Sequence, residues 1–222
     1  MRLLPVVLAC LLLNACGSTQ DADRIVLGRT NEMLVPNVLQ YQDQFVVQVT
    51  DTDGFPIPSS IVTITLRNLQ YRKGTMVLAD TNADGEVDQW VSLPTATCTA
   101  EDTNNNAVLD AGEDINLNGT LEPTNPATVD AHPSLTPTFD PGTNEIVTDD
   151  QGYGYFVITY PKSEGLWVQV EINAKTDVAG TENLETYKEL LPISLEDALN
   201  LEVQPAGVIS NYGTSANCTD AL

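Results

Sequence analysis

The sequence predicts an all-β protein built as an antiparallel β-sandwich. Several short segments alternate apolar and polar side chains, which is the pattern of a strand with one buried face. Clusters of Asp, Asn, Gly and Pro separate these segments, and those residue types favour turns. No long stretch shows the 3.6-residue period of an amphipathic helix. About seven short strands joined by turns are typical of a sandwich.

The alternation defines the strands in chain order. Phe45, Val47 and Val49 form one apolar face, and the turn-rich connection 51–58 separates them from the next alternating segment. The expected strands are 45–50, 61–66, 71–78, 87–93, 155–160, 166–172 and 185–191. Residues 82–85 are expected to turn the chain between the third and fourth strands. Near the C-terminus, Ser194 and Asp197 give a capping-box signal for one short helical turn.

The first fifteen residues have the composition of an export signal. Arg2 supplies positive charge, and the apolar run 3–13 is too short to cross a bilayer as a helix. The run ends in LNAC, which resembles the lipobox of bacterial lipoproteins, with Asn14 unusual at its position. The resemblance implies a lipid anchor on Cys16. Because Gly17 rather than Asp follows, it also implies the outer membrane, on its periplasmic or exposed side. A plain secretory signal is the alternative.

Two cysteines remain after the leader, because Cys10 leaves with the signal and Cys16 carries the lipid. An even pair in an exported chain most often forms a disulfide, so Cys98 and Cys218 are expected to pair. The alternative is two free buried thiols. The bond would close a loop of about 120 residues and stabilise the fold by about 4 to 5 kcal/mol in the chain-entropy model.

These features divide the chain. The expected parts are a signal peptide at 1–15, an N-terminal tether at 16–23, and a sandwich at 24–222 that is interrupted by an insert at about 98–147.

The charge is strongly negative and unevenly distributed. The formal net charge is −22, and residues 74–161 contain no Lys or Arg but 15 of the 31 acidic residues. Such a surface repels nucleic acid and anionic lipid headgroups, so neither is an expected ligand. It attracts divalent cations instead.

Residues 101–123 place oxygen-bearing side chains at metal-ligand spacing twice in succession. Twelve-residue calcium loops take ligands from positions 1, 3, 5, 7, 9 and 12, with a backbone carbonyl at 7 and a bidentate Glu at 12. In the first loop these positions are Asp102, Asn104, Asn106, the carbonyl of Val108, Asp110 and Glu113. Ala107 occupies position 6, where Gly is usual.

A second loop begins at the next residue. Its ligands are Asp114, Asn116, Asn118, the carbonyl of Thr120, and Glu122, with Gly119 at the sharp turn. Asn125 stands at position 12, where a bidentate Glu is expected. Calcium takes six to eight oxygens, whereas this stretch has no His or Cys ligand set for zinc, and magnesium usually keeps its waters. Two calcium ions are therefore expected. The alternative is a flexible acidic loop.

A third set of oxygens lies between two predicted strands. Asp80, Asn82, Asp84 and Asp88 fall at positions 1, 3, 5 and 9 of a third calcium loop, but Val91 stands at position 12. A hairpin turn explains this segment equally well.

Other candidates for chemistry are few. His132 is the only histidine and precedes a proline, with no nucleophile in a recognised motif nearby, so it is not expected to act as a catalytic base or ligand. Trp90 and Trp167 fall on the polar faces of their strands. We expect the insert to cover them, and the alternative is an exposed pair that stacks on a sugar ring.

Three segments carry a resemblance to a family. They are VTDTDGFPIPSSIVTITL, TDDQGYGYFVITYP and WVQVEINAKTDVAGTE, which together resemble the bacterial immunoglobulin-like domains of invasin and intimin type surface proteins. Those domains pair a strand ending in TD-x-x-G-x-P with a later TD-x-x-G turn, matched here at 50–58 and 148–152. The resemblance implies an immunoglobulin-like sandwich of the kind that serves as a stalk, spacer or binding head. Separately, the insert resembles EF-hand loops and the Asp/Asn repeats of thrombospondin type 3 and dockerin modules.

These observations predict a non-enzymatic, calcium-binding lipoprotein of the cell envelope. The insert has few apolar residues, so metal rather than burial is expected to order it. Those apolar residues, which are expected to dock on the sandwich, are Val108, Leu109, Ile115 and Leu117. The expected function is surface adhesion or interaction with a protein or glycan ligand. The alternative is a structural spacer or a subunit of a surface assembly, in which calcium only rigidifies the domain.

Overall fold

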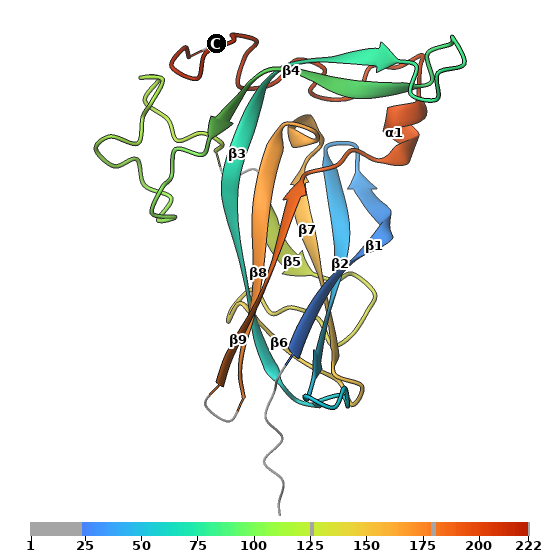
Figure 1. Ribbon diagram of the computed structural model, residues 1–222, viewed down its shortest axis with the longest axis vertical. Helices are drawn as coiled ribbons and strands as arrows, with labels where there is room; N and C mark the ends of the chain where they lie inside the picture. The colour runs from blue at the N-terminus through green and yellow to red at the C-terminus, as the bar shows by residue number, and fades with distance from the viewer. Residues whose placement is uncertain (1–23, 125–126, 179–180, 222) are drawn as a thin grey trace, which may run out of the picture.

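A computed structural model describes residues 24–124, 127–178 and 181–221 of the chain. Within these residues nine strands form two antiparallel sheets that pack face to face, which confirms the predicted all-β sandwich (Figure 1). No helix of the described part is long and apolar enough to span a membrane. The expected signal peptide, the tether and the lipidated Cys16 lie outside the described residues.

The first sheet has four strands in the order β1-β2-β7-β5. Their bounds are β1 Arg24–Asn37, β2 Gln40–Thr50, β7 Tyr153–Pro161 and β5 Thr128–Ala131. The second sheet has the order β4-β3-β8-β9, and β6 adds to β3. Its strands are β4 Gln89–Thr99, β3 Ile61–Ala79, β8 Val168–Val178, β9 Thr181–Leu190 and β6 Glu145–Val147. Two short helices complete the fold, η1 at Lys162–Glu164 and α1 at Leu195–Leu199.

The core lies between the sheets and follows from the alternation in the sequence. Phe45, Val47 and Val49 are fully buried on one face of β2. The Phe45 ring stacks on Phe156 of β7 at a centroid distance of 5.3 Å and meets Tyr187 of β9 edge-on at 5.6 Å. Because β9 belongs to the second sheet, this aromatic group joins both layers.

Two predicted strands, 61–66 and 71–78, are one continuous strand, so their separation was wrong. The polar residues between them pair with β8 instead of turning. The strand bends later, at a register shift between Lys73 and Gly74. Gly74 has φ +143°, and a Cβ there would lie 2.3 Å from the carbonyl oxygen of Leu93, so only Gly fits. Beyond this bend, β3 and β4 extend across the end of the sandwich (Figure 1).

Strands β1, β5 and β6 were not predicted. In β1 the alternation is interrupted, because the register with β2 shifts between Arg29 and Met33. Strands β5 and β6 lie inside the expected insert at about 98–147 and pair with β7 and β3. Residues 100–124 of that segment carry no strand, and the insert refers to these residues from here on.

The C-terminal segment covers both tryptophans, and the expectation that the insert would do so was wrong. Trp167 is fully buried and its Nε1 donates to the carbonyl oxygen of Gly207 at 2.7 Å. Trp90 is 9% exposed and its Nε1 donates to the carbonyl oxygen of Asn200 at 2.9 Å. Neither ring is available to stack on a sugar, so that alternative was wrong too. The predicted cap is present, since the backbone N–H of Asp197 donates to Oγ of Ser194 at the start of α1.

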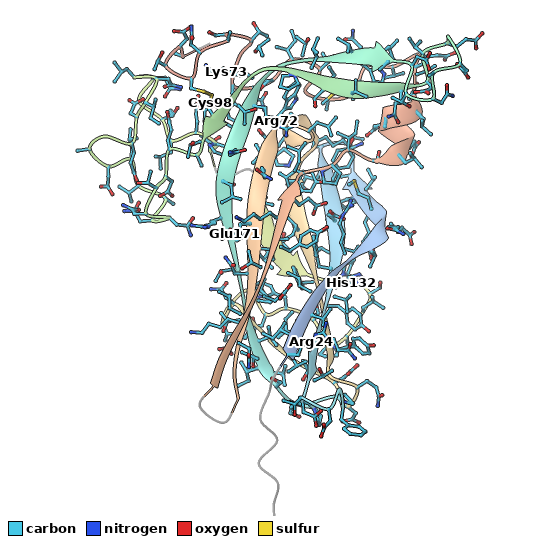
Figure 2. All side chains as sticks on the ribbon, viewed as in Figure 1. Arg24, Arg72, Lys73, Cys98, His132 and Glu171 are labelled. Atoms are coloured by element: carbon cyan, nitrogen blue, oxygen red, sulfur yellow. A yellow bond between two sulfur atoms is a disulfide. The ribbon has the colours of Figure 1, made fainter. Side chains whose placement is uncertain are left out.

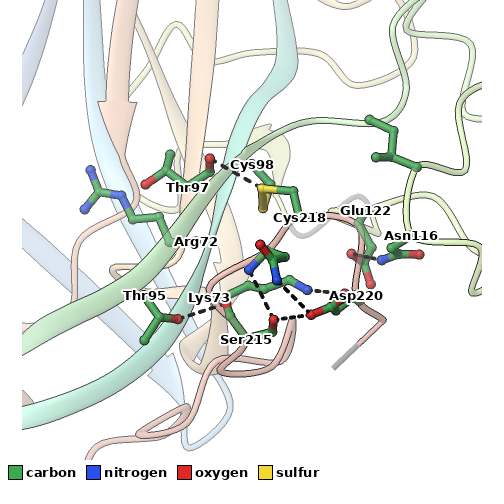
Figure 3. The surroundings of a disulfide bond; sticks show 12 residues. Arg72, Lys73, Thr95, Thr97, Cys98, Asn116, Glu122, Ser215, Cys218 and Asp220 are labelled. Carbon is green, nitrogen blue, oxygen red and sulfur yellow. Dashed lines mark hydrogen bonds between the residues drawn. A yellow bond between two sulfur atoms is a disulfide. The ribbon is translucent and has the colours of Figure 1, made fainter.

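A disulfide joins Cys98 to Cys218, as predicted, and ties the chain end to β4 (Figure 3). The preceding residues add an antiparallel contact with β3, where Met76 donates to the Val208 carbonyl at 2.7 Å. Nearby, the fully buried Lys73 donates through Nζ to the carbonyl oxygen of Asp220. The bond therefore holds the C-terminal segment against the sheet that carries the insert.

Candidate metal centre in the insert

The insert leaves the sandwich at the end of β4, directly after the disulfide. Figure 1 shows it projecting sideways from β3 and β4 as irregular loops, which are called the lobes below. At its base, the backbone N–H of Glu101 donates to the carbonyl oxygen of Glu122 at 2.7 Å, which brings its two ends together. Asn68 of β3 donates to the carbonyl oxygen of Pro123 at 3.4 Å. The base is thereby attached to the sheet.

In the first loop, the side chains at positions 1, 3 and 5 accept hydrogen bonds from the backbone that follows them. Asp102 accepts the N–H groups of Asn106 and Ala107 at 3.1 and 2.8 Å. Asn104 Oδ1 accepts the N–H of Asn106 at 3.0 Å, and Asn106 Oδ1 accepts that of Val108 at 2.8 Å. These bonds draw three predicted ligand side chains into one turn.

The second loop repeats the same bonds twelve residues later. Asp114 accepts the N–H groups of Asn118 and Gly119 at 3.0 and 2.9 Å. Asn116 Oδ1 accepts the N–H of Asn118 at 3.1 Å, and Asn118 Oδ1 accepts that of Thr120 at 2.8 Å. The two loops are thus one structural unit built twice.

The segment between β3 and β4 has this geometry as well. Asp80 accepts the N–H groups of Asp84 and Gly85 at 3.2 and 2.7 Å. Asn82 Oδ1 accepts the N–H of Asp84 at 3.0 Å, and Asp84 Oδ1 accepts that of Glu86 at 2.9 Å. The segment connects the two strands of a hairpin, which was the alternative interpretation. Its backbone also has the same hydrogen-bonded turn as the two insert loops.

The backbone dihedral angles agree with the hydrogen bonds. In each loop the residues at positions 4 and 6 have φ between +57° and +96°, namely Asn105 and Ala107, Leu117 and Gly119, and Ala83 and Gly85. Three of these six residues are Ala or Leu. A residue with a Cβ atom adopts a positive φ only at a cost in free energy. The side-chain oxygens that hold the turn offset this cost.

In each insert loop, the carboxylate at position 9 accepts hydrogen bonds from the side-chain amides at positions 3 and 5. Asp110 Oδ2 accepts from Nδ2 of Asn104 at 2.8 Å and from Nδ2 of Asn106 at 2.9 Å. These two bonds lower the pKa of the Asp110 carboxyl, so it stays charged. Glu122 accepts the corresponding bonds in the second loop at 2.8 and 2.7 Å.

Glu113 closes the first loop from position 12. Its Oε1 accepts the backbone N–H of Thr103 at 2.9 Å, and its Oε2 accepts that of Asp110 at 3.0 Å. The two N–H groups belong to loop positions 2 and 9. The bonds from Asp110 and Thr103 lower the pKa of Glu113.

Glu101 closes the second loop in the same way, although it precedes the first. Its Oε1 accepts the N–H of Ile115 at 3.0 Å and its Oε2 accepts that of Glu122 at 3.0 Å, again positions 2 and 9. This role of Glu101 was not predicted, because the twelfth position of the second loop falls on Asn125. That residue lies outside the described residues. The repeat of E-D-x-N-x-N at 101 and 113 is the signal that could have identified Glu101.

The loop between β3 and β4 has no such closing carboxylate. There the N–H groups of Thr81 and Asn82 donate to Asp88 Oδ2, both at 3.1 Å. Across the described residues, no three Asp, Glu, His or Cys side chains converge at metal-binding distance. Each insert loop instead combines carboxylates with Asn side-chain oxygens, and oxygen donors of this kind suit calcium.

The base of the insert is buried and rich in carboxylates. Glu101 is fully buried, and Glu113 and Glu122 are 5% and 7% exposed. Burial raises the pKa of Glu101. Burial also raises the pKa of Tyr71 on β3, and so do the charges of Glu122 and Glu101, which therefore face the sandwich. Among the described residues, no carboxylate at 101–123 forms an ion pair with Lys or Arg.

The apolar residues of the insert do not dock on the sandwich, contrary to expectation. Their exposed fractions are 56% for Val108, 38% for Leu109, 43% for Ile115 and 85% for Leu117. They lie on lobes that project away from the sheets, whereas carboxylates and Asn116 occupy the buried base. A cleft of about 380 Å³ lies between the two loops, with Leu109 and Leu121 in its wall.

His132 is buried and makes hydrogen bonds that hold the neighbouring backbone in place. Figure 2 shows it beside the first sheet, remote from the insert. Its Nδ1 accepts the backbone N–H groups of Ser134 and Leu135 at 3.2 and 2.9 Å, and its Nε2 lies 2.7 Å from Gln44 Oε1. These contacts select the neutral tautomer with the proton on Nε2. Burial lowers the pKa of His132.

The lowered pKa gives a prediction. His132 of the unfolded chain takes up a proton near the ordinary histidine pKa of about 6.5, whereas folded His132 resists protonation. The contribution of His132 to the free energy of unfolding is therefore fully present above that pH and is lost as the pH falls below it. Urea unfolding at pH 7.5 and 5.5 measures the loss. His132→Gln should lose less stability over this interval than the wild type, and because no other histidine is present, an equal loss in both proteins would contradict the assignment.

Comparisons with protein-family models, with curated proteins and with solved structures found no match for this chain.

Proposed function

We propose that this chain is a calcium-binding lipoprotein of the cell envelope, with an immunoglobulin-like sandwich that presents the insert for interaction at the cell surface. The invasin-like and lipobox motifs support the fold type and the anchor, and the insert supports the metal. The chain has no nucleophile and base in a shared motif, so we propose a non-enzymatic role.

The repeated loop geometry is the observation that carries the metal proposal. Each carboxylate and amide oxygen that holds the turn accepts one or two N–H donors, and each carboxylate has about four lone-pair positions. Lone pairs therefore remain on Asp102, Asn106, Asp110 and Glu113. These side chains do not converge in the structure as it stands, and we propose that they close on a cation while the backbone turn stays formed. Calcium would supply the positive charge that organises these oxygens.

The charge at the base favours the same conclusion. Glu101 and Glu122 are buried charges whose described partners are neutral N–H groups, and leaving such charges without a cation is costly. Two calcium ions add four positive charges to the six carboxylates between residues 101 and 123. Calcium would thus offset most of the repulsion that the apo insert carries.

The exposed lobes favour an interaction role over that of a spacer. The side chains of Leu117 and Val108 face solvent, and the cleft between the loops is open to a ligand. Figure 2 shows Arg24, where the described chain begins, at the end of the sandwich opposite to Cys98. An anchor at the N-terminal end would therefore present the insert away from the membrane. A glycan array probed with and without calcium separates the roles: calcium-dependent retention supports adhesion, and silence supports a spacer.

Replacing the two closing glutamates tests the metal sites separately. Calorimetric titration of the wild type should give two sites with Kd of about 10⁻⁴ to 10⁻³ M, the range of extracellular modules. Glu113→Gln should weaken the first site and Glu101→Gln the second, each by about tenfold or more, because a carboxylate ligand is lost. Glu196→Gln on exposed α1 is the matched control. Heat no greater than dilution in the wild type would contradict calcium binding, and an unchanged Glu101→Gln isotherm would contradict the role of Glu101.

A further inference from the structure

A second group of charged side chains lies at the seam where the edge strands of the two sheets meet. Arg29 of β1 and Asp43 of β2 belong to the first sheet, and Glu189 of β9 belongs to the second. The seam cluster, as we name these three residues, is separate from the insert. It joins the layers at a place where no strand pairing connects β1 to β9.

One N–H group serves both carboxylates of the seam cluster. Nε of Arg29 lies 2.6 Å from Asp43 Oδ2 and 2.9 Å from Glu189 Oε1. The Asp43 side chain is 1% exposed and that of Glu189 is 10% exposed. Asp43 Oδ1 is buried without a hydrogen-bond partner. A buried carboxylate oxygen in this state needs a donor.

Among the described residues, Arg29 is the one cation that acts on both Asp43 and Glu189. The other titratable side chains that face the seam cluster are Tyr160 of β7 and Tyr187 of β9. The Tyr160 hydroxyl donates to the carbonyl oxygen of Pro192 at 2.8 Å and is therefore engaged elsewhere. Burial raises the pKa of both tyrosines, so they stay neutral. Two carboxylates and one guanidinium would leave a net negative charge in a buried position, which is costly.

We propose that Asp43 and Glu189 share one proton, and that this proton makes the seam cluster a pH-dependent clasp between the two sheets. The protonated Glu189 carboxyl donates its O–H to Asp43 Oδ1, which supplies the missing donor and makes the cluster neutral. When the proton is lost in alkaline solution, the two carboxylates repel each other across the seam. The contact between β1 and β9 then weakens.

The pKa of Glu189 is shifted in the direction that this clasp requires. Burial raises it to about 8, assisted by the charge of Asp43 and a hydrogen bond to that residue. Burial also raises the pKa of Asp43. The folded pKa of Glu189 lies above the unfolded value of about 4.3, so the clasp contributes its full stability below that pH. The contribution is lost as the pH rises through about 8.

Carboxyl-detected NMR of the calcium-loaded full chain labelled with ¹³C-glutamate tests the proposal, with the Glu189 signal assigned through bonds. We expect a titration midpoint near pH 8 for Glu189. Asp43→Asn should lower the Glu189 midpoint by at least one pH unit, because the neighbouring charge is removed. A wild-type midpoint below about 5.5 would overturn the shared proton.

Amide hydrogen exchange tests the consequence for the seam. Between pH 6.5 and 9, protection factors of β1 and β9 should fall about tenfold in the wild type, whereas those of β3 and β8 should stay constant. Glu189→Gln should abolish the pH dependence, and Glu185→Gln, the matched control, should retain it. Equal protection of β1 and β9 at both pH values in the wild type would overturn the clasp even if the proton is shared.

Discussion

Calcium removal is expected to expose the insert to proteolysis while the sandwich stays resistant. The six carboxylates at 101–123 lie within twenty-three residues of the sequence with no Lys or Arg among them, and without a cation their repulsion opposes the turn. Elastase cuts after small apolar residues, which the insert offers at Ala107, Val108 and Ala111. Cleavage should accelerate by about tenfold or more when a chelator replaces millimolar calcium.

Trypsin provides the internal control for this experiment. Residues 74–161 contain no Lys or Arg, so trypsin cannot cut the insert in either state. Its digestion pattern should be the same with and without chelator, which would show that the sandwich stays folded. Equal elastase cleavage between Asn104 and Asn118 in both conditions would contradict ordering by metal. If trypsin also became faster, the effect of calcium would extend to the whole domain.

Loss of the disulfide is expected to have the largest effect on stability. The Cys98–Cys218 bond spans 120 residues, and in the chain-entropy model its removal costs about 4 to 5 kcal/mol. For a domain of this size, that corresponds to a decrease in Tm of roughly 10 °C or more. The double variant Cys98→Ser/Cys218→Ser, compared with the wild type by urea and thermal unfolding, measures the effect.

The structure adds a second readout to the disulfide experiment. The bond holds the segment whose Gly207 carbonyl accepts the Trp167 indole N–H, so release of the chain end should expose that ring. Its fluorescence should shift to the red before global unfolding. The wild type with reduced disulfide should behave as the double variant does. A loss below about 1 kcal/mol with unchanged fluorescence would contradict a stabilising role for the chain end.

The fold was predictable wherever alternation was strong. The alternating residues around Phe45 and those of β7 and β8 lie in the strands expected for them. Strand β1 was missed because a shift in register after Arg29 interrupts its pattern. The continuity of β3 was missed because its polar middle is stabilised by pairing with β8, a segment about a hundred residues away in sequence.

The site was predictable to the extent that it is local. Positions 1, 3, 5 and 9 of each loop lie within a few residues of one another, and one turn of backbone brings them together. Glu101 was not predictable by that route, because it closes a loop that begins thirteen residues later. The exposure of Leu117 also depends on where the lobes project, which no local pattern specifies.

Taken alone, the sequence determined the strand period, the twelve-residue spacing of oxygen-bearing side chains, and the pairing of Cys98 with Cys218. Each depends on neighbours along the chain or on a simple count. The tertiary structure decided which carboxylate closes the second loop, that the C-terminal segment covers Trp90 and Trp167, and that Glu189 faces Asp43. These depend on contacts between segments distant in sequence, and such contacts are set by how the two sheets pack.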